Sequence, residues 1–119
     1  MNREYGTTAV AAGVVELAPF RTRPGVDDAT VLAASDALQR EFLDGRPGFI
    51  RRDLLRNSDG SWLDLLYWAD ERSAMSVMDD IASSNACQQY FALMEGADAA
   101  DPGAGVSHFS IVRPYGPDR

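Results

Sequence analysis

Apolar and polar residues follow two different periods along residues 62–94, and this stretch organises the chain. Residues 62–68 alternate with a period of two, as a strand requires, because successive side chains point to opposite faces of a sheet. Asp70 then occupies a position suited to cap a helix. Apolar residues recur after it at three- and four-residue steps: Ala74, Met78, Ile81, Cys87, Phe91 and Met94. Residues 83–85 (Ser-Ser-Asn) interrupt this stripe, and we predict a kink or restart there.

The rest of the chain supplies four further elements. Residues 14–20 alternate as a first strand, and Asp27 begins a helix that ends at Gly45. The core-facing residues of this helix are Val31, Ala34, Leu38 and Phe42. Residues 49–55 predict a second strand, which a turn at residues 57–60 joins to the strand at 62–68 as a hairpin. Residues 106–112 predict a last strand.

The order strand, helix, strand, strand, helix, strand is that of an α+β, ferredoxin-like βαββαβ domain. Right-handed crossovers then give a four-stranded antiparallel sheet in the order four, one, three, two, with both helices on one face. We place this domain at residues 13–113, between a flexible N-terminal tail at 1–12 and a C-terminal tail at 114–119. Apolar residues on the other face make full exposure unfavourable, so we expect a homodimer in which a second copy covers that face.

Charge and composition exclude several classes of function. A net charge of -7 disfavours binding to nucleic acid, whose phosphates attract basic surfaces. The chain contains no Lys, which excludes Schiff-base chemistry and a Lys-containing phosphate loop. One His and one Cys are too few for a metal site within a chain, and no dinucleotide-binding glycine motif is present, so we expect neither a metal nor an organic cofactor. The sequence shows no signal peptide or membrane span, and we expect a cytoplasmic protein without membrane contact.

Three segments resemble the antibiotic biosynthesis monooxygenase type of dimeric α+β barrel. They are VVELAPFRTRPG at residues 14–25, RPGFIRRDLLRNSDGSWLDLLYWADERSAM at 46–75, and VSHFSIV at 106–112. The shared features are the Pro-Gly-Phe before strand two, the Asp-Gly hairpin and the Trp that ends strand three. This resemblance covers nearly the whole chain. It implies a homodimer with a small-molecule cavity between sheet and helices, and an activity on an aromatic or polyketide-like compound.

The family pattern also implies where a site would lie, although the chain departs from it. Members that oxygenate polycyclic phenols without a cofactor carry a Trp at the end of strand three, an Asn four residues earlier, a Tyr six residues later and an Arg further along. Here Trp68 matches the Trp, whereas the Asn and Tyr positions hold Asp64 and Ala74. No cationic residue between Arg72 and Arg113 matches the Arg. The haem-degrading branch needs a His on the second helix, which this chain lacks.

Strand parity predicts a polar cluster on adjacent strands. Glu16, Asp64 and His108 fall on one face of strands one, three and four. An imidazole between two carboxylates is suited to proton transfer, so these three are the candidate catalytic residues. The alternative is structural, because networks of ion pairs imitate functional sites, and Arg51 and Asp53 share the same parity.

The candidate substrate contacts are aromatic or polar. Trp62 and Trp68 would form a flat apolar wall, and Tyr67, Asn85 and Tyr90 complete the set. Two functions remain open: an enzyme that oxygenates, cyclises or isomerises a small aromatic compound, or a non-catalytic dimer that binds a small molecule or stabilises a partner.

Which face lies under the helices is also open. Periodicity alone places an entirely apolar set there or in the dimer core, whereas the resemblance turns Trp68 and Asp64 toward the cavity, and we prefer the second assignment. The apolar set is Val15, Leu17, Ile50, Leu54, Leu63, Leu65, Tyr67, Phe109 and Ile111.

Overall fold

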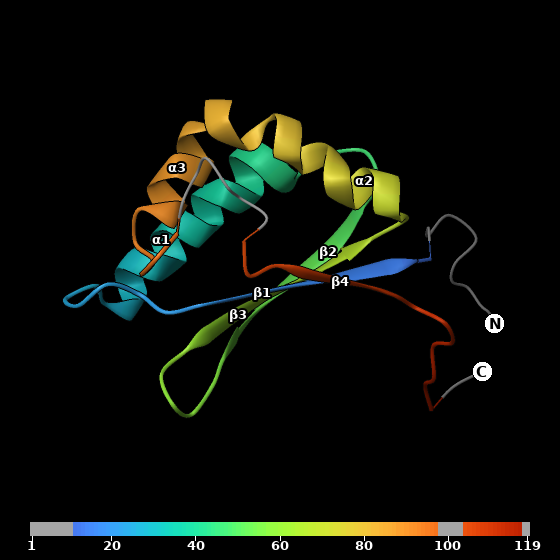
Figure 1. Ribbon diagram of the computed structural model, residues 1–119, viewed down its shortest axis with the longest axis horizontal. Coiled ribbons are helices and arrows are strands. Elements are labelled where there is room, and N and C mark those ends of the chain that lie inside the picture. Colours follow the sequence, from blue (N-terminus) through green and yellow to red (C-terminus); the bar gives the residue numbers. More distant parts are fainter. Residues whose placement is uncertain (1–10, 98–103, 118–119) are drawn as a thin grey trace.

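The computed structural model describes residues 11–97 and 104–117. Four strands, β1 (Val14–Phe20), β2 (Phe49–Arg56), β3 (Trp62–Trp68) and β4 (Ser107–Ser110), form one antiparallel sheet in the order β2-β3-β1-β4. The helices α1 (Asp28–Leu38), α2 (Glu71–Met75) and α3 (Asn85–Phe91) lie on one side of the sheet (Figure 1). The predicted α+β fold and sheet order are therefore confirmed. The tail predicted at 1–12 falls outside the described residues except for residues 11 and 12.

The second helical region is broken, as the interruption of its apolar stripe predicted. Asp70 caps α2 by accepting a hydrogen bond from the backbone N–H of Ser73, and Ser84 caps α3 in the same way through Cys87. The short 3₁₀ turns η2 (Ser76–Asp79) and η3 (Ile81–Ser83) connect the two helices. A π-helical turn, η1 (Gln39–Leu43), similarly extends α1. None of the helices in the described ranges is long and apolar enough to cross a membrane.

Strand β2 contains a bulge that the sequence did not reveal. Phe49 pairs with Trp68 but Arg51 pairs with the next residue of β3, Tyr67, so one extra residue is inserted between them. Beyond the bulge the alternation is reversed. Arg52 lies opposite Leu66 and Leu54 lies opposite Asp64. The prediction that Arg51 and Asp53 share the face of Asp64, and that Leu54 does not, is therefore wrong.

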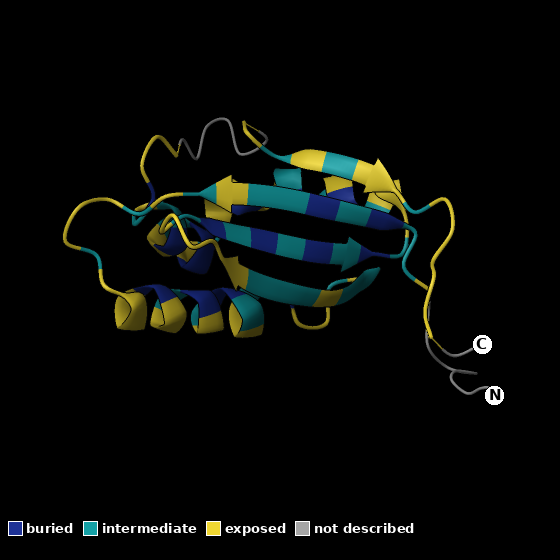
Figure 2. Ribbon diagram, turned by 90° about the horizontal axis from the view of Figure 1, so that it is seen from below, coloured by how far each residue is buried: buried dark blue, intermediate teal, exposed yellow. Residues whose placement is uncertain are grey.

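Burial alternates along the two central strands (Figure 2). In β3 every second residue, from Trp62 to Trp68, is buried, and the residues between them are half-buried. In β1 the same is true of Val14 and Glu16. The helices therefore cover the face that carries Asp64 and Trp68, as the family resemblance implied. Periodicity alone placed the apolar set beneath the helices or in the dimer core. Its members that pair within the sheet lie on the open face, except for Leu54, which lies opposite Asp64: they are Val15, Leu17, Leu63, Leu65, Tyr67 and Phe109.

The last strand is shorter than predicted. It ends at Ser110, which pairs with Val14 at the beginning of β1. Since β1 extends no further, the residues after Ser110 have no partner strand in which to continue. Residues 112–117 are exposed.

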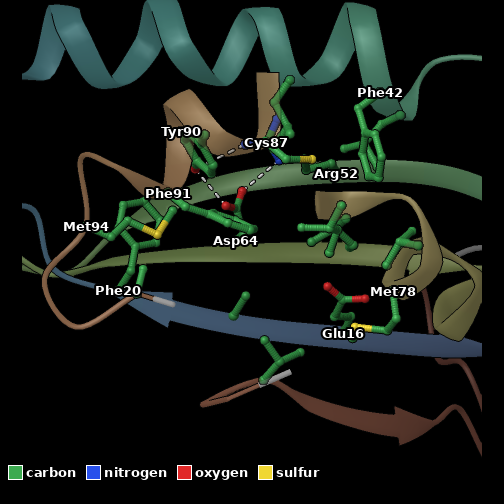
Figure 3. A pocket seen from close by; sticks show the side chains of 18 of the residues that line it. Glu16, Phe20, Phe42, Arg52, Asp64, Met78, Cys87, Tyr90, Phe91 and Met94 are labelled. Carbon is green, nitrogen blue, oxygen red and sulfur yellow. Dashed lines mark hydrogen bonds and ion pairs between the residues drawn. The ribbon is translucent and has the colours of Figure 1, made fainter. Parts of the chain in front are cut away.

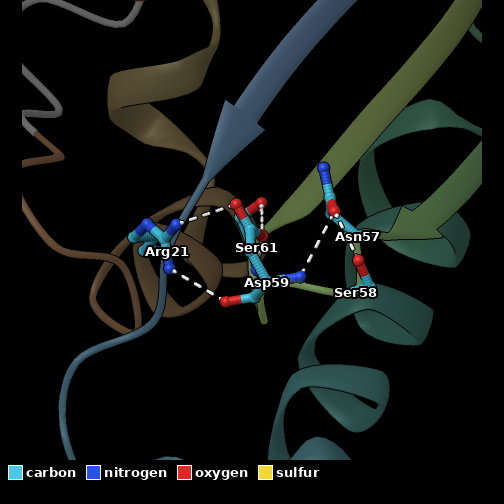
Figure 4. Close-up of polar contacts among 5 residues, drawn as sticks. All are labelled: Arg21, Asn57, Ser58, Asp59 and Ser61. Atoms are coloured by element: carbon cyan, nitrogen blue, oxygen red, sulfur yellow. Dashed lines mark hydrogen bonds and ion pairs between the residues drawn. The ribbon is translucent and has the colours of Figure 1, made fainter.

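The turn of the β2–β3 hairpin is held by side chains (Figure 4). The side chain of Asn57 accepts a hydrogen bond from the backbone N–H of Asp59, whose own carboxylate accepts from the backbone and hydroxyl of Ser61. Arg21, just after β1, bonds to the same carboxylate at 3.1 Å. The turn contains Gly60 at φ 92°, a conformation that side chains with a Cβ rarely adopt.

Candidate functional site

A cavity of about 140 Å³ lies between the sheet and the helices (Figure 3). Its walls are mostly apolar and come from every layer of the fold. The apolar residues that line it include Phe20, Leu38, Phe42, Leu66, Val77, Met78, Ile81, Phe91 and Met94. Its polar lining comes from Glu16, Arg52, Asp64 and Tyr90, with Trp68 and Cys87 beside them. An apolar cavity with a few convergent polar groups is the usual form of a small-molecule site.

Glu16 projects from β1 and is 8% exposed. Its Oε1 accepts a hydrogen bond of 3.1 Å from the indole Nε1 of the fully buried Trp68. The same oxygen lies 3.2 Å from Nε2 of His108, which is opposite Glu16 on β4. Burial raises the pKa of Glu16 because it disfavours the charged form, and the contacts with His108 and Trp68 offset part of this effect. The result is a carboxyl group that is more basic than usual.

Asp64 projects from β3 into a second polar cluster. Its Oδ1 accepts a hydrogen bond of 2.7 Å from Nε of Arg52, and its Oδ2 accepts one of 2.7 Å from the hydroxyl of Tyr90. Both members of the ion pair are buried, at 5% and 7% side-chain exposure. The remaining N–H groups of Arg52 bind the carbonyl and hydroxyl of Ser35, the side chain of Gln39 and the oxygen of Tyr90. A buried ion pair is tolerated only when it is bonded this completely.

The pKa shifts of Arg52 and Tyr90 in this second cluster keep both side chains protonated. For Arg52, burial acts to lower the pKa, but the adjacent Asp64 raises it by more. Burial and the same carboxylate raise the pKa of Tyr90, whose hydroxyl therefore stays protonated. Asp64 is thus held between a permanent cation and a permanent donor.

The three candidate catalytic residues are on the same side of the sheet but do not form one cluster. Glu16 and His108 are in contact, while Asp64 binds Arg52 and Tyr90 instead. The register explains this separation, because β1 lies between β3 and β4 and Asp64 pairs with Ala18, two residues beyond Glu16. In the described part of the chain, His108 therefore contacts one of the two carboxylates.

Two of the five candidate substrate contacts, Trp68 and Tyr90, line the cavity. Trp62 is buried elsewhere, stacked on Phe20 with 6.1 Å between ring centres. Tyr67 points to the opposite face of the sheet, where the guanidinium of Arg51 lies 4.9 Å from its ring centre. Asn85 is an exposed residue at the beginning of α3.

Arg52 is the important residue that sequence reasoning missed. Two adjacent arginines precede Asp53, and simple alternation assigned Arg51 to the face of Asp64. The bulge reverses this choice. A signal was nevertheless present, because a buried Asp64 requires a cationic partner, and strand two supplies two neighbouring candidates.

Few groups in this site suit a metal ion. Among the residues that the structure describes, no set of three or more His, Cys, Asp or Glu side chains is arranged to hold one. The absence of a metal and an organic cofactor stays a prediction from the sequence.

Comparison with known proteins identifies the fold. No family model matches the chain, and neither does any curated protein. Among solved structures, SnoaB, a cofactor-independent oxygenase from Streptomyces nogalater, is similar with a TM-score of 0.62 and 18% identity, over 92% of this chain and 100% of that one. A variant of the same enzyme with one Asn replaced by Ala has a TM-score of 0.64 at 17% identity over the same shares.

A proposed antibiotic biosynthesis monooxygenase from Caulobacter crescentus CB15 is also similar, with a TM-score of 0.59 and 15% identity, over 86% of this chain and 92% of that one. The chain therefore has the antibiotic biosynthesis monooxygenase-type fold, as the sequence resemblance implied. Identities this low establish the fold alone, and a shared fold does not determine the function.

Proposed function

We propose that this protein is an enzyme that transfers a proton to or from a small aromatic compound held in the cavity, without a metal or an organic cofactor. The observation that carries this proposal is Glu16: a buried carboxylate, with a raised pKa, at the wall of an apolar cavity. A cleft that holds a titratable group with a perturbed pKa is a candidate active site. A base whose pKa is raised toward the working pH is also more effective in proton transfer.

Glu16 is the proton acceptor in this proposal. An O–H or C–H bond of the substrate breaks, the proton passes to the carboxylate, and the electron pair stays on the substrate. Trp68 holds the carboxylate in place through its indole N–H. His108 is 20% exposed and does not line the cavity, so it can exchange the proton of Glu16 with solvent.

Two outcomes of the deprotonated substrate fit the site. Return of the proton to a different atom gives isomerisation. Attack of the anion on a carbonyl carbon of the same molecule, followed by return of the proton to the carbonyl oxygen, gives cyclisation. Reaction of an electron-rich anion with dioxygen as co-substrate gives oxygenation, and SnoaB, whose fold the chain shares, is a cofactor-independent oxygenase. Dioxygen consumption separates these two reactions.

A direct test uses exchange of ring hydrogens for deuterium in phenol, resorcinol and hydroquinone, followed by NMR in D₂O under nitrogen. This reaction needs proton transfer alone. The protein should accelerate the exchange, and Glu16→Gln should reduce the rate by roughly a hundredfold to ten-thousandfold. Asp36→Asn, on the exposed side of α1, is the control and should keep the full rate. Equal rates for Glu16→Gln and the parent protein would contradict the role of Glu16.

The second candidate function is a non-catalytic protein that binds a small molecule or stabilises a partner. The observation in its favour is the cluster around Asp64, in which Arg52 and Tyr90 are already bonded as in a purely structural network. Binding of an aromatic compound without any exchange or oxygenation would support this alternative.

We also propose that the protein is a homodimer formed through the open face of the sheet. Half-buried apolar residues from β1 and β3 lie on this face, and Phe109 of β4 is 57% exposed there. A second copy would remove this surface from water. Light scattering should then give twice the chain mass of 12.9 kDa. A cytoplasmic location and the absence of nucleic-acid binding remain predictions from the sequence.

A further inference from the structure

The hydrogen-bond donors of the cavity are already in use. The indole N–H of Trp68 goes to Glu16, and the hydroxyl of Tyr90 goes to Asp64. The guanidinium of Arg52 has five N–H groups, and they bind the five acceptors described above. Among the residues that the structure describes, and apart from the weak S–H of Cys87, the side chains that line the cavity have no donor left for a ligand.

Acceptors, in contrast, remain available. The two contacts of Glu16 are both made by Oε1, and Oε2 accepts no hydrogen bond from any described residue. Each oxygen of Asp64 accepts one hydrogen bond, whereas a carboxylate offers about four lone-pair sites in all. The ionised carboxylate of Glu16 can therefore accept a hydrogen bond from a ligand, and so can the carboxylate of Asp64. The polar side chains of the cavity favour a ligand that donates.

The charge of the cavity points in the same direction. Arg52 balances Asp64 within its ion pair, so the ionised Glu16 adds a negative charge without a fixed cation. The carboxylate of an anionic ligand would lie beside this charge in an apolar environment. Since charges of equal sign repel strongly where water is excluded, an aromatic carboxylate is disfavoured.

The volume of the cavity and the distance between its two carboxylates define the ligand further. Its volume of about 140 Å³ is close to that of an engineered apolar cavity, about 150 Å³, that binds benzene. Asp64 is diagonal to Glu16 across the β1–β3 ladder, a relation that separates the two residues by about 7 to 8 Å and their Cβ atoms by somewhat less. One ring with two substituents can therefore reach both carboxylates, whereas a polycyclic compound exceeds this volume.

We propose that the cavity selects a neutral compound with one aromatic ring that donates two hydrogen bonds, one to Glu16 and one to Asp64, and that it excludes aromatic carboxylates. This inference rests on the proposed function in one respect: it takes the same cavity as the ligand site. In this proposal Asp64 binds the end of the ligand that is farther from Glu16. Arg52 is the residue that positions Asp64.

The test is a matched series of ligands measured by calorimetry at about pH 8 under nitrogen, where a free carboxylic acid is ionised. The compounds are hydroquinone, 4-methoxyphenol, 1,4-dimethoxybenzene and benzoate, which offer two donors, one donor, no donor and a carboxylate. Each lost donor should weaken binding by about tenfold or more, and benzoate should not bind. Protection of Cys87, the one cysteine of the chain, from a small thiol reagent places the ligand in the cavity.

A variant of Glu16 tests whether this carboxylate causes the preference for a ligand with two donors. In Glu16→Gln the amide oxygen can still accept from Trp68, and the new amide group can donate to an ether oxygen. The preference for hydroquinone over 4-methoxyphenol should then fall toward one, while Asp36→Asn should keep it. Asp64→Asn is less useful here because it leaves Arg52 without its partner and endangers folding.

The outcomes separate this inference from the proposed function. A preference for hydroquinone without catalysed deuterium exchange would support the inference and contradict the enzyme. Turnover of an aromatic carboxylate would support the enzyme and overturn the inference. Equal binding of 1,4-dimethoxybenzene and hydroquinone, or no binding of any compound in the series, would also overturn it.

Discussion

Glu16 and Arg52 place charged groups inside an apolar layer in two different ways. Arg52 is neutralised by Asp64 and has an acceptor for each N–H group, so its burial is compensated. Glu16 is compensated only in part, by one indole N–H and one imidazole, and its pKa is raised. Incomplete compensation is a cost for folding, and it is also what makes Glu16 a useful base.

The raised pKa of Glu16 predicts a specific dependence of stability on pH. As pH rises from the usual 4.5 of the carboxyl group, the unfolded chain loses its proton before the folded protein does. The free energy of unfolding therefore falls across the interval up to the higher folded pKa. Glu16→Gln removes this loss, so its stability relative to the parent should increase between about pH 4 and pH 7. Urea unfolding at both pH values measures the difference, and a constant difference would contradict the shift.

The adjacent residues Arg51 and Arg52 allow a controlled test of the buried ion pair, because the same substitution can be made at each. Arg52→Met leaves the carboxylate of Asp64 buried without its cation and should lower the free energy of unfolding by about 3 to 5 kcal/mol. Arg51→Met removes an exposed charge next to Asp53, and should lower the free energy of unfolding clearly less than Arg52→Met does, because water screens an exposed ion pair. Urea unfolding of the two variants at pH 7 compares them, and similar losses would show that Asp64 does not depend on Arg52.

At the scale of elements, the bulge in β2 and the break between α2 and α3 shape the cavity. The bulge turns Arg52 toward the helices, and the break allows two short helices, with turns between them, to follow the twisted sheet. Side-chain caps at Asp70 and Ser84 begin the two helices separately. Val77 and Met78, in the turn that follows α2, line the cavity together with Tyr90 and Phe91 of α3.

Gly48, just before β2, lies against α2, and this contact predicts that replacing Gly48 destabilises the protein more than replacing Gly60. Gly48 and Gly60 both have positive φ angles, of 79° and 92°, which other residues adopt at a cost of about 1 kcal/mol. At Gly48 an added Cβ would also collide with the side chain of Ser73 in α2, whereas at Gly60 it would meet open space. Gly48→Ala should therefore lower the melting temperature clearly more than Gly60→Ala. Equal losses in calorimetry would mean that the contact with α2 relaxes freely.

At the scale of the molecule, the helices leave one face of the sheet without a cover (Figure 2). A sheet with one solvated face usually carries polar residues there, but this face carries the wholly apolar sides of β1 and β3. This composition is the physical basis of the proposed homodimer. It also separates the two roles of the sheet, since the cavity uses the opposite face.

Two exposed apolar residues allow a controlled test of the dimer. Phe109 is 57% exposed on the open face, and Leu32 is 49% exposed on α1. Phe109→Asp should place a charge in the interface and shift the mass from twice 12.9 kDa to 12.9 kDa in light scattering. Leu32→Asp should leave the mass unchanged. A dimer that persists in Phe109→Asp, or that dissociates in Leu32→Asp, would place the interface elsewhere.

The order and type of the elements, the helix cap at Asp70 and the hairpin were determined by the sequence itself. Each depends on residues near in the chain: Asp70 caps the helix that follows it, and the turn around Gly60 joins strands that are adjacent in sequence. The match of sequence expectation and structure is therefore close for β1 and β3, whose limits agree with the prediction.

The tertiary structure alone decided which side chains meet. One inserted residue in β2 exchanged Arg51 for Arg52, because a shift of one residue moves every later side chain to the other face. The sheet register likewise left Asp64 with Arg52 and Tyr90, and Glu16 with His108. Residues distant in the chain are brought together by strand pairing and packing, and a periodic pattern carries no record of their register. The elements were thus local properties of this sequence, while the site is a property of the whole fold.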